Sequence, residues 1–408
     1  MLSWTTAGES HGPALIALME GMPAGVPVTT EMIRDALAER RLGYGRGARQ
    51  SFERDEVTIL SGVRHGWTTG APIAIEIGNS EWPKWQAVMS ADPVDEAELR
   101  VDAGKGDSRE MSRNKKLQAP RPGHADLAGM ISYRTDDARN ILERASARET
   151  AARVALGALA RSLLRVVAGT EVIGHVVEVG NVSGEPVVLP VPGDRAALQA
   201  SSMRTLDPKL EEAFTTVVDS AKEGGDTVGG VVEVVAWNVP LGLGSHVSSE
   251  MKLDAQIAAA LMGVQSAKAV EIGDGFAAAR SFGSAVQDEI VLESGAVTRS
   301  SNRSGGIEGG TSNGEPIVAR VGFKPISTIP RALSTVNLST GEEESAFHQR
   351  SDTCQVVPAA VICESMVALI VARALTQRFG GRSVSEVKEQ VAGQRRYADS
   401  ILLREAGE

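Results

Sequence analysis

The sequence predicts a mixed fold of the α+β or α/β layered class. Segments with helical signals alternate with short strand-like runs along the whole chain, which is the pattern of packed helix and sheet layers. Hydrophobic residues make up 42% and charged residues 23% of the 408 positions, enough to build a large core. No internal repeat or Pro-rich linker divides the chain. We therefore expect one domain over residues 1–408, although length alone would allow two or three.

Five segments carry the sequence signals of α-helices. The strongest is residues 143–167, which is rich in Ala, Leu and Arg, lacks an internal Pro, and is followed by a stop at Gly169. In residues 31–41 the apolar side chains recur at helical spacing, and Thr30 is the expected N-cap. The other expected helices are residues 207–222, 253–270 and 359–379.

Short runs of β-branched or alternating apolar residues predict strands between these helices. The expected strands are residues 14–20, 57–60, 73–77, 172–179, 231–239 and 316–323. Two segments show no apolar period. Residues 105–116, with five basic and two acidic side chains, are expected to form a polar surface loop, and residues 393–408 a polar C-terminal tail.

The charge balance limits the classes of partner. Lys and Arg number 42 and Asp and Glu 52, a net charge of −10 that gives no support to a general nucleic-acid or membrane-surface binder. The N-terminus lacks the basic and apolar regions of a signal peptide, and residues 356–375 are too interrupted by polar side chains to span a membrane. Cys354 and Cys363 fit reduced thiols. We therefore expect a cytoplasmic protein.

An arginine-rich segment follows the first expected helix. Residues 40–49, RRLGYGRGAR, contain four arginines and no acidic residue. Guanidinium groups bind carboxylates and phosphates in bidentate fashion, and the interleaved glycines let several of them converge on one anion. A solvated basic loop is the alternative. Because the rest of the chain is acidic, we favour a binding site for a small anion.

Two of the six histidines lie in settings that suit chemistry. His11 lies between glycines in GESHG, and His124 lies in the Pro-containing turn RPGHAD, so a ligand can reach either imidazole. Each could equally be a loop histidine that hydrogen-bonds its own turn. His65, His175 and His246 are interpreted as structural. No two histidines stand at helical i, i+3 or i+4 spacing, so no metal site is predicted.

Two further segments offer polar groups for a ligand. The Gly-rich residues 304–314 match neither the dinucleotide nor the P-loop pattern, and alone they predict only turns. Together with residues 324–328, KPIST, they supply backbone N–H groups, hydroxyls and an ammonium group suited to a phosphorylated cofactor. Asp352 is either a carboxylate available for proton transfer or, like Thr353, a candidate N-cap of the following helix.

Several long motifs together resemble the chorismate synthase family. They are GESHGPALIALMEG from Gly8, ERASARETAARVALGAL from Glu143 and RSDTCQVVPAAVICESM from Arg350, with RLGYGRGAR, RPGHAD, KAVEIGDGF and the stretch from NRSGGIEGG to KPIST. The resemblance implies a large β-α-β sandwich core and a homotetramer. It also implies a carbon–oxygen lyase that acts in the shikimate pathway. Its reaction is the 1,4-anti elimination of phosphate from 5-enolpyruvylshikimate 3-phosphate (EPSP) to chorismate, with reduced FMN and no net redox change.

The resemblance also implies two ligand sites. The substrate carries two carboxylates and a phosphate, so the expected clamp is Arg40, Arg46 and Arg49, of which the family associates the first two with NADPH as well. The expected FMN site comprises Arg144, Ala145, Ser146, Gln265, Ser266, Gly309, Lys324, Pro325, Ile326, Ser327, Thr328 and Arg350.

Five residues have roles in the chemistry that the resemblance implies. His11 is the expected acid toward the reduced flavin, and His124 is expected to protonate or neutralise the departing phosphate. Asp352 is the expected base for the proton lost from C6 of the substrate, by way of flavin N5. Ser10 and Ser146 are expected to support these groups by hydrogen bonds. Cations near the phosphate and an electron-rich flavin both favour cleavage of the C3–O bond.

The chain has no room for a separate flavin reductase domain, so we expect a monofunctional enzyme that receives reduced FMN from an external reductase, with NADPH as the ultimate reductant. An FMN-dependent oxidoreductase with net hydride transfer is the alternative enzyme. A non-catalytic sensor of anionic metabolites is the alternative outside catalysis. Such a sensor would keep the arginine-rich segment but would have no use for His11, His124 and Asp352 together.

Overall fold

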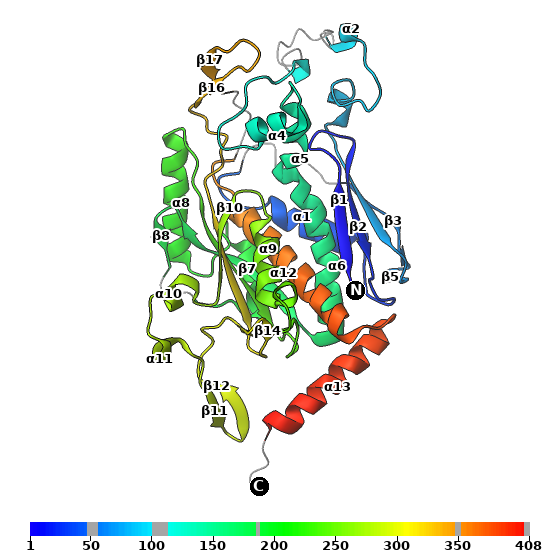
Figure 1. The fold of residues 1–408 in the computed structure, drawn as a ribbon, viewed down its shortest axis with the longest axis vertical. Helices are drawn as coiled ribbons and strands as arrows, with labels where there is room; N and C mark the ends of the chain where they lie inside the picture. Colours follow the sequence, from blue (N-terminus) through cyan, green and yellow to red (C-terminus); the bar gives the residue numbers. More distant parts are fainter. Residues whose placement is uncertain (47–55, 100–112, 185–187, 347–351, 404–408) are drawn as a thin grey trace.

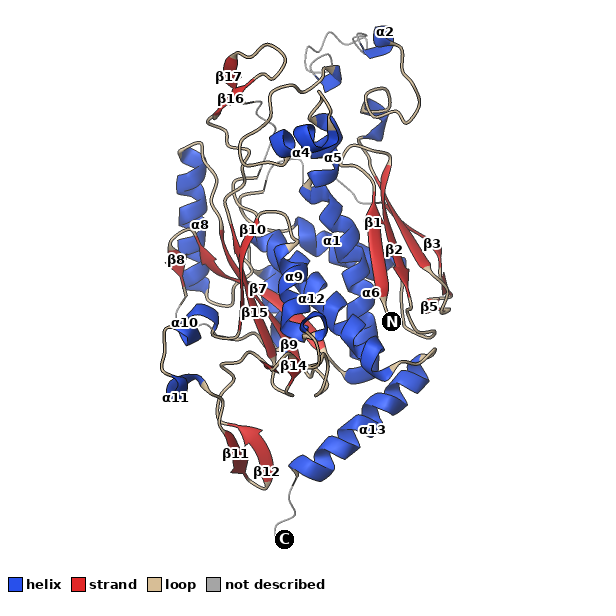
Figure 2. Cartoon of the chain, viewed as in Figure 1, coloured by secondary structure: helices blue, strands red, loops and turns tan. Residues whose placement is uncertain are grey.

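Two antiparallel β-sheets enclose a layer of helices in the computed structural model of the chain (Figure 1). The structure describes residues 1–46, 56–99, 113–184, 188–346 and 352–403. The sandwich order is visible when the chain is coloured by secondary structure, with a sheet on each side and the long helices between them (Figure 2). The mixed class expected from the sequence is confirmed.

The smaller sheet has the strand order β1-β2-β6-β3. Its strands are β1 (Ser3–Ala7), β2 (Ala14–Glu20), β6 (Ile73–Gly78) and β3 (Glu56–Ser61). In β2 and β6 every second residue is buried, because one face of the sheet packs on the helices and the other is covered less. Leu15, Ala17 and Met19 of β2 enter the core in this way.

The larger sheet has the strand order β10-β15-β9-β7-β8. Its strands are β10 (Ala267–Ile272), β15 (Ile317–Phe323), β9 (Gly230–Trp237), β7 (Glu171–Val179) and β8 (Val182–Ser183). All neighbours pair antiparallel. The valine-rich β7 and β9 are buried along most of their length, which explains why both read as continuous apolar runs in the sequence.

Four helices form the middle layer: α1 (Thr30–Arg41), α6 (Thr150–Ala168), α9 (Leu253–Met262) and α12 (Val356–Phe379). α6 and α12 approach closely at Gly157, where any side chain would collide with Ser365. α12 is long and apolar enough to cross a membrane by composition, but 94% of its most apolar window is buried within the chain. It is the central helix of the core.

A buried ion cluster ties this layer to the larger sheet. Glu364 of α12 is fully buried, pairs with Arg161, Arg195 and Arg204, and accepts the backbone N–H of Gly174 at 3.0 Å. Burial alone would raise the pKa of Glu364, but the three guanidinium groups outweigh it and lower the pKa to about 2. The cluster joins α6, α12 and β7 in one place.

The remaining elements lie around the sandwich. α8 (Pro208–Glu223) packs against β7 and β8, and α13 (Val384–Leu402) packs against α6 at the lower end of Figure 1. The shorter helices are η2 (Trp82–Lys84), α2 (Glu96–Leu99), α4 (Asp126–Tyr133), α5 (Arg139–Ala145), η3 (Ala147–Glu149), η4 (Pro192–Asp194), α7 (Arg195–Ala200), η5 (Ser249–Met251), α10 (Gly275–Ala279) and α11 (Gly283–Val286). The shorter strands are β4 (Val63–Arg64), β5 (Trp67–Thr68), β11 (Ile290–Glu293), β12 (Ala296–Arg299), β13 (Ile307–Glu308), β14 (Thr311–Ser312), β16 (Ser334–Val336) and β17 (Glu343–Ser345).

Two expected helices are wrong in their extent. The helix expected over residues 253–270 ends at Met262, because the chain turns through Ser266, which has a positive φ of 70°, and then enters β10. The helix expected over residues 143–167 is interrupted at Ser146, which is extended and caps the turn η3 by accepting the N–H of Arg148. Ser and its hydroxyl favour such a cap over a helix interior.

Smaller differences concern the ends of other segments. The N-cap of α1 is Thr29 rather than Thr30, since the Thr29 hydroxyl accepts the N–H of Met32. Residues 304–314 are not only turns, because they contain the β13–β14 hairpin. In the expected C-terminal tail, the residues up to Leu402 form the last turns of α13. Of the expected loop at residues 105–116, only residues 113–116 belong to the described chain.

One end of the sandwich gathers loops from distant parts of the sequence. We call this the upper end, as it is drawn in Figure 1, and define it as residues 8–13, 121–126, 143–150, 324–328 and 352–355. α6 and α12 both begin there, and so does β9, since Val228, two residues before the strand, bridges to Cys354. Most of the predicted site residues lie in these loops.

Candidate active site

Hydrogen bonds connect the loops of the upper end to one another. The backbone N–H of Ser10 donates to the carbonyl of Glu143 at 2.9 Å, and so joins the loop after β1 to α5. The ammonium group of Lys324 donates to the carbonyl of Gly123 at 2.7 Å. The backbone N–H of Lys324 donates to the carbonyl of Ser266 at 3.0 Å. The loop of Ser10 and His11 is therefore bonded to α5, and Lys324 is bonded both to the turn of His124 and to Ser266.

His11 is held by a carboxylate from α5. Its backbone N–H donates to Oε2 of Glu143 at 2.9 Å, and its Nδ1 lies 2.9 Å from each carboxylate oxygen. The indole of Trp85 stacks on the imidazole, with ring centroids 3.8 Å apart and planes inclined by 23°. The alternative that His11 hydrogen-bonds its own turn is wrong, because its partner is 132 positions away.

The two predicted serines contact each other. The hydroxyl of Ser146 donates to the hydroxyl of Ser10 at 3.1 Å. Arg144, two residues earlier, donates to the carbonyls of Thr6 at 2.9 Å and Gly8 at 3.2 Å. These bonds fasten the end of β1 to the α5–α6 junction, so His11 and both serines are placed by the same pair of segments. Ala145 is the last residue of α5.

Glu149, at the start of α6, collects several donors. Its carboxylate accepts the hydroxyl of Thr6 at 2.6 Å, the guanidinium of Arg153 at 2.8 Å and the amide of Gln265 at 3.3 Å. The Oε1 atom of Gln265 is buried and has no hydrogen-bond partner among the described residues. A buried acceptor left without a donor costs about 1–3 kcal/mol, so this oxygen is suited to a ligand donor.

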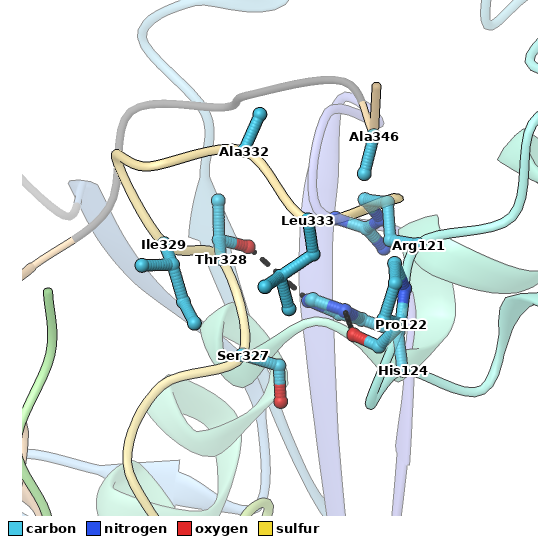
Figure 3. A pocket seen from close by; sticks show the side chains of 9 residues that line it. All are labelled: Arg121, Pro122, His124, Ser327, Thr328, Ile329, Ala332, Leu333 and Ala346. Atoms are coloured by element: carbon cyan, nitrogen blue, oxygen red, sulfur yellow. Dashed lines mark hydrogen bonds between the residues drawn. The ribbon is translucent and has the colours of Figure 1, made fainter. Parts of the chain in front are cut away.

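His124 lies in a small cavity between its own turn and residues 327–333 (Figure 3). Its Nδ1 lies 3.0 Å from the carbonyl of Pro122, and its Nε2 lies 3.2 Å from the hydroxyl of Thr328. The turn interaction considered for this histidine is therefore present, together with a second one across the cavity. Burial, with the positive charge of Arg121, lowers the pKa of His124 below its usual 6.5. The imidazole is neutral at neutral pH.

The segment Lys324 to Thr328 follows β15 and closes one side of the same cavity. Lys324 donates to the hydroxyl of Ser327 at 2.7 Å, and the carbonyl of Ile326 accepts the hydroxyl of Thr227 at 2.7 Å. Burial, followed by repulsion from Lys268, lowers the pKa of Lys324. Pro325 adjoins a groove of about 430 Å³ that this loop shares with the ends of β9 and β10. The loop is held in place by side chains that a ligand can also contact.

The predicted clamp arginines have partners within the chain. Arg40 donates from Nε to the hydroxyl of Thr150 at 2.9 Å and from a terminal nitrogen to the carbonyl of Ala147 at 3.0 Å. Arg46 forms an ion pair with Asp352 at 2.5 Å, with little of either side chain exposed. Two predicted site residues are thus brought into direct contact. Arg49 and Arg350 lie outside the described residues.

The alternative role of Asp352 or Thr353 as a helix cap is wrong. The residue before α12 is Gln355, which makes no side-chain capping bond. Thr353 instead donates its backbone N–H to the carbonyl of Gly45 at 2.8 Å, next to the Arg46–Asp352 pair. The arginine-rich segment and the start of α12 are therefore packed side by side, which leaves the N-terminus of α12 at the upper end.

Gly309 is not brought together with the other predicted residues. It lies between β13 and β14, and the carbonyl of its neighbour Gly310 accepts the backbone N–H of Leu253, the first residue of α9. Gln265 and Ser266 follow the opposite end of α9. Because an α-helix rises about 1.5 Å per residue, the ten residues of α9 separate the two positions by roughly 15 Å.

Three residues around His11 were missed by the sequence reasoning. Glu143 was noted only as the start of a motif, and Trp85 and Arg139 were not singled out. Arg139 lies 3.5 Å from the Glu143 carboxylate, and its guanidinium lies 5.5 Å from the Trp85 ring centroid. Arg113, from the described end of the expected polar loop, lies 5.0 Å from the same centroid. Only the spacing of Arg139 and Glu143 on one helix face gave a signal beforehand.

The described geometry can be compared with known proteins. The family model described as chorismate synthase matches residues 2–376. The chain belongs to the chorismate synthase family. Chorismate synthases of Streptomyces avermitilis and Mycobacteroides abscessus are each 55% identical to it, over 99% of the chain and 99% and 95% of their own lengths. A crystal structure of a chorismate synthase is similar with a TM-score of 0.75 at 37% identity, and each chain is covered to 98%.

Membership in the chorismate synthase family makes the chain an enzyme of the lyase class. The resemblance inferred from the motifs is confirmed, and so is the mixed fold that it implied. The roles of individual residues remain predictions. The structure shows where these residues lie. Hydrogen bonds link Ser10 with Ser146, Gln265 with Glu149, Lys324 with Ser266 and Gly123, and Thr328 with His124.

Proposed function

We propose that the chain catalyses the 1,4-anti elimination of phosphate from EPSP to give chorismate, in the shikimate pathway, with reduced FMN and without net redox change. The observation that carries the proposal is the convergence of His11, His124 and Lys324 at one end of a chain that matches the chorismate synthase model over residues 2–376. Both the reaction and the cofactor are inferred from the family and from the chemistry of this end.

The upper end suits an anionic substrate. α6 and α12 both begin there, and their N-cap residues, Glu149 and Gln355, make no side-chain capping bond. The N-terminus of a helix carries unpaired N–H groups and partial positive charge, which favours anions. Arg121 and Lys324 add positive charge beside His124. A substrate with two carboxylates and a phosphate has complementary charge for this end.

The residues present also fit FMN. The buried Oε1 of Gln265 offers an acceptor to a polar ring edge, and the hydroxyls and ammonium group of the 324–328 loop suit a phosphate. We propose that Arg144, Ser146, Gln265, Ser266 and this loop hold the cofactor, and Ala145, Gly309 and Arg350 remain candidates. Bound FMN would supply electron density that helps expel phosphate. NADPH is the proposed ultimate reductant.

His124 is proposed to assist the departure of phosphate. Its Nδ1 faces the carbonyl of Pro122, which can only accept, so Nδ1 carries the proton of the neutral ring and Nε2 accepts the Thr328 hydroxyl. The lowered pKa keeps the ring neutral in the free protein. An incoming phosphate would raise that pKa, and a proton taken up at Nε2 could then neutralise the leaving group.

Asp352 and Arg46 are proposed to act as a pair. Their ion pair joins the Asp352 carboxylate, the group proposed as the base, to the Arg46 guanidinium. A substrate carboxylate can compete with Asp352 for the Arg46 guanidinium, since arginine binds either carboxylate in the same geometry. Asp352 would then be available to accept the proton lost from C6 of the substrate, while Arg46 holds the substrate in place.

The deciding experiment uses the whole protein without oxygen, with reduced FMN and EPSP. Release of phosphate together with chorismate, with the flavin still reduced at the end, is the expected result. Oxidation of flavin in proportion to product would instead identify an FMN-dependent oxidoreductase with net hydride transfer. Tight binding of EPSP with no turnover would identify a sensor. A sample lacking FMN is the control for spontaneous breakdown.

Three further properties of the chain are proposed because the family implies them. The chain is proposed to form a homotetramer, to take reduced FMN from an external flavin reductase, and to work in the cytoplasm. The free, buried thiols of Cys354 and Cys363 agree with a reducing compartment. Sedimentation of the purified protein tests the assembly state directly.

A further inference from the structure

The buried carboxylate of Glu143 has no part in the proposed elimination, yet it is bonded to His11 in three ways. It accepts the backbone N–H of His11, and both of its oxygens lie 2.9 Å from Nδ1 of the ring. Glu143 is 2% exposed and His11 9%. A buried carboxylate that is hydrogen-bonded to a histidine orients that ring and determines which ring nitrogen carries the proton.

The geometry determines the tautomer. Carboxylate oxygens only accept hydrogen bonds, so Nδ1 of His11 must donate to Glu143. Nε2 forms no hydrogen bond with the described residues, and it is therefore the nitrogen left for a ligand. The Trp85 ring lies flat on the imidazole at a centroid distance of 3.8 Å, which hinders the ring from turning over and exchanging its two edges.

Charged groups surround the His11–Glu143 pair and its Trp85 cover. Arg139 lies 3.5 Å from the Glu143 carboxylate, and Arg139 and Arg113 both lie over the Trp85 ring that covers His11. The Glu143 carboxylate therefore contacts the Arg139 guanidinium as well as the imidazole.

We infer that Glu143 is a positioning residue that keeps His11 in the Nδ1–H tautomer and presents Nε2 for proton transfer. The inference rests on the proposed function, in which His11 acts as an acid. In that step the Nε2–H bond breaks, the proton passes to the acceptor, and its electron pair stays on Nε2. The ring is left neutral, with its Nδ1 proton still bonded to Glu143.

The substitution Glu143→Gln makes this inference testable, because an amide has one acceptor and one donor group. With its oxygen taken by the backbone N–H of His11, the amide NH₂ faces Nδ1. A donor in the place of Oε1, 2.9 Å from Nδ1, opposes a proton on Nδ1 and favours the neutral ring with its proton on Nε2. A ring in this tautomer cannot cycle a proton at Nε2 without losing its bond to residue 143.

The experiment records ¹⁵N spectra of the whole protein, labelled in its histidine imidazoles, by magic-angle spinning. The His11 signals are assigned by their loss in His11→Gln. We expect a protonated Nδ1 in the natural protein and a protonated Nε2 in Glu143→Gln. We expect kcat for phosphate release to fall by about 10²- to 10⁴-fold in this variant. Glu143→Asp, which keeps the carboxylate, should retain the tautomer and lose less activity.

A second buried pair provides the matched control. Glu233 bonds Nε2 of His175 at 2.8 Å in the larger sheet, away from the upper end. Glu233→Gln breaks a pair of the same kind. It should leave the His11 signals unchanged and kcat per folded molecule within about twofold of the natural value, as expected for a residue without direct or positioning contact to the site.

Several outcomes would overturn the inference. A neutral His11 ring that carries its proton on Nε2 instead of Nδ1 in the natural protein would do so even if no variant folds. Unchanged His11 signals or unchanged kcat in Glu143→Gln would do so as well. Failure of the proposed function can be told apart from failure of this inference. If the proposed function is wrong, the natural protein releases no phosphate from EPSP, whereas the His11 tautomer is measured without substrate.

Discussion

Two buried histidine–glutamate pairs lie in different regions of this molecule and have different surroundings. At the upper end, Glu143 bonds Nδ1 of His11. In the larger sheet, Glu233 bonds Nε2 of His175, and its other oxygen accepts the Arg320 guanidinium at 2.7 Å. The sheet pair is enclosed between neighbouring strands, while the upper-end pair joins a loop residue, His11, to helix α5. The same two residue types therefore stabilise a sheet in one place and orient a reactive ring in the other.

The difference extends to the other buried charges. Glu364, in the interior, is surrounded by three arginines and a backbone N–H, so its charge is balanced within the core. Gln265, whose amide contacts Glu149 of the upper end, keeps a buried oxygen without a partner among the described residues. An interior that satisfies its polar groups gains stability, whereas an active site keeps polar groups for its ligands. Substitutions in the two regions should separate activity from stability.

The largest effect on activity is expected from His124→Ala. Loss of the imidazole removes the group that can take a proton beside the leaving phosphate, so kcat should fall by about 10²- to 10⁴-fold. Stability should change little, because the cavity around His124 already has room for about one water, some 10 Å³. Steady-state assays with thermal unfolding of the same samples measure both. A variant with natural kcat would remove His124 from the mechanism.

The largest effect on stability is expected from Glu364→Ala. The change leaves three buried or half-buried guanidinium groups without their shared carboxylate, and breaking such a pair costs about 3–5 kcal/mol of unfolding free energy. Denaturant unfolding measures it. The activity of the remaining folded protein should be retained, since the partners of Glu364 in the described chain are Arg161, Arg195, Arg204 and Gly174, none of them a predicted site residue. A stable Glu364→Ala variant with low kcat would reverse the assignment of the two regions.

The same carboxyl predicts how stability depends on pH. The pKa of Glu364 is lowered to about 2 in the folded chain from an ordinary value of 4.5. A depressed carboxyl pKa means that the unfolded chain binds the proton more readily, so stability rises with pH in this window. The contribution is complete above pH 4.5 and is lost as pH falls toward 2. Across this pH range, the free energy of unfolding should change less with pH in Glu364→Ala than in the natural protein.

The smallest effect is expected at the surface. Arg165 pairs with Glu171 at 2.5 Å, and the Arg165 side chain is 58% exposed. Exposed ion pairs contribute less than about 1 kcal/mol because water and salt screen them. Arg165→Ala should therefore lower the midpoint of denaturant unfolding only slightly and leave kcat unchanged. A loss of unfolding free energy as large as that of Glu364→Ala would show that the Arg165 charge stabilises the buried cluster around Glu364.

Sequence patterns predicted the regular elements well where burial is simple. β2 was predicted with its observed bounds, Ala14–Glu20, and the helix now called α8 differs by one residue at each end. The patterns failed where tertiary contacts decide, as at the end of α9, where the apolar run continues into β10. Periodicity alone cannot separate a buried helix from a buried strand over so few residues.

The candidate site shows the same division. His11 and His124 were singled out from their glycine and proline neighbours, since local backbone chemistry is written in adjacent residues. The partners of His11 were not, because Trp85 and Glu143 lie 74 and 132 positions away from it in the sequence (85 − 11 and 143 − 11). A stack or a carboxylate–imidazole contact over such separations has no periodic signal.

By itself, the sequence determined the mixed layered fold, the chorismate synthase family and the residue types available for chemistry. These follow from hydrophobic patterning and from long motifs, which are properties of neighbouring positions. Only the tertiary structure decided which residues meet: Glu143 with His11, Arg46 with Asp352, and Glu364 with its three arginines. The physical reason is that a buried charge is stabilised by whatever partner the packed layers bring within hydrogen-bond distance.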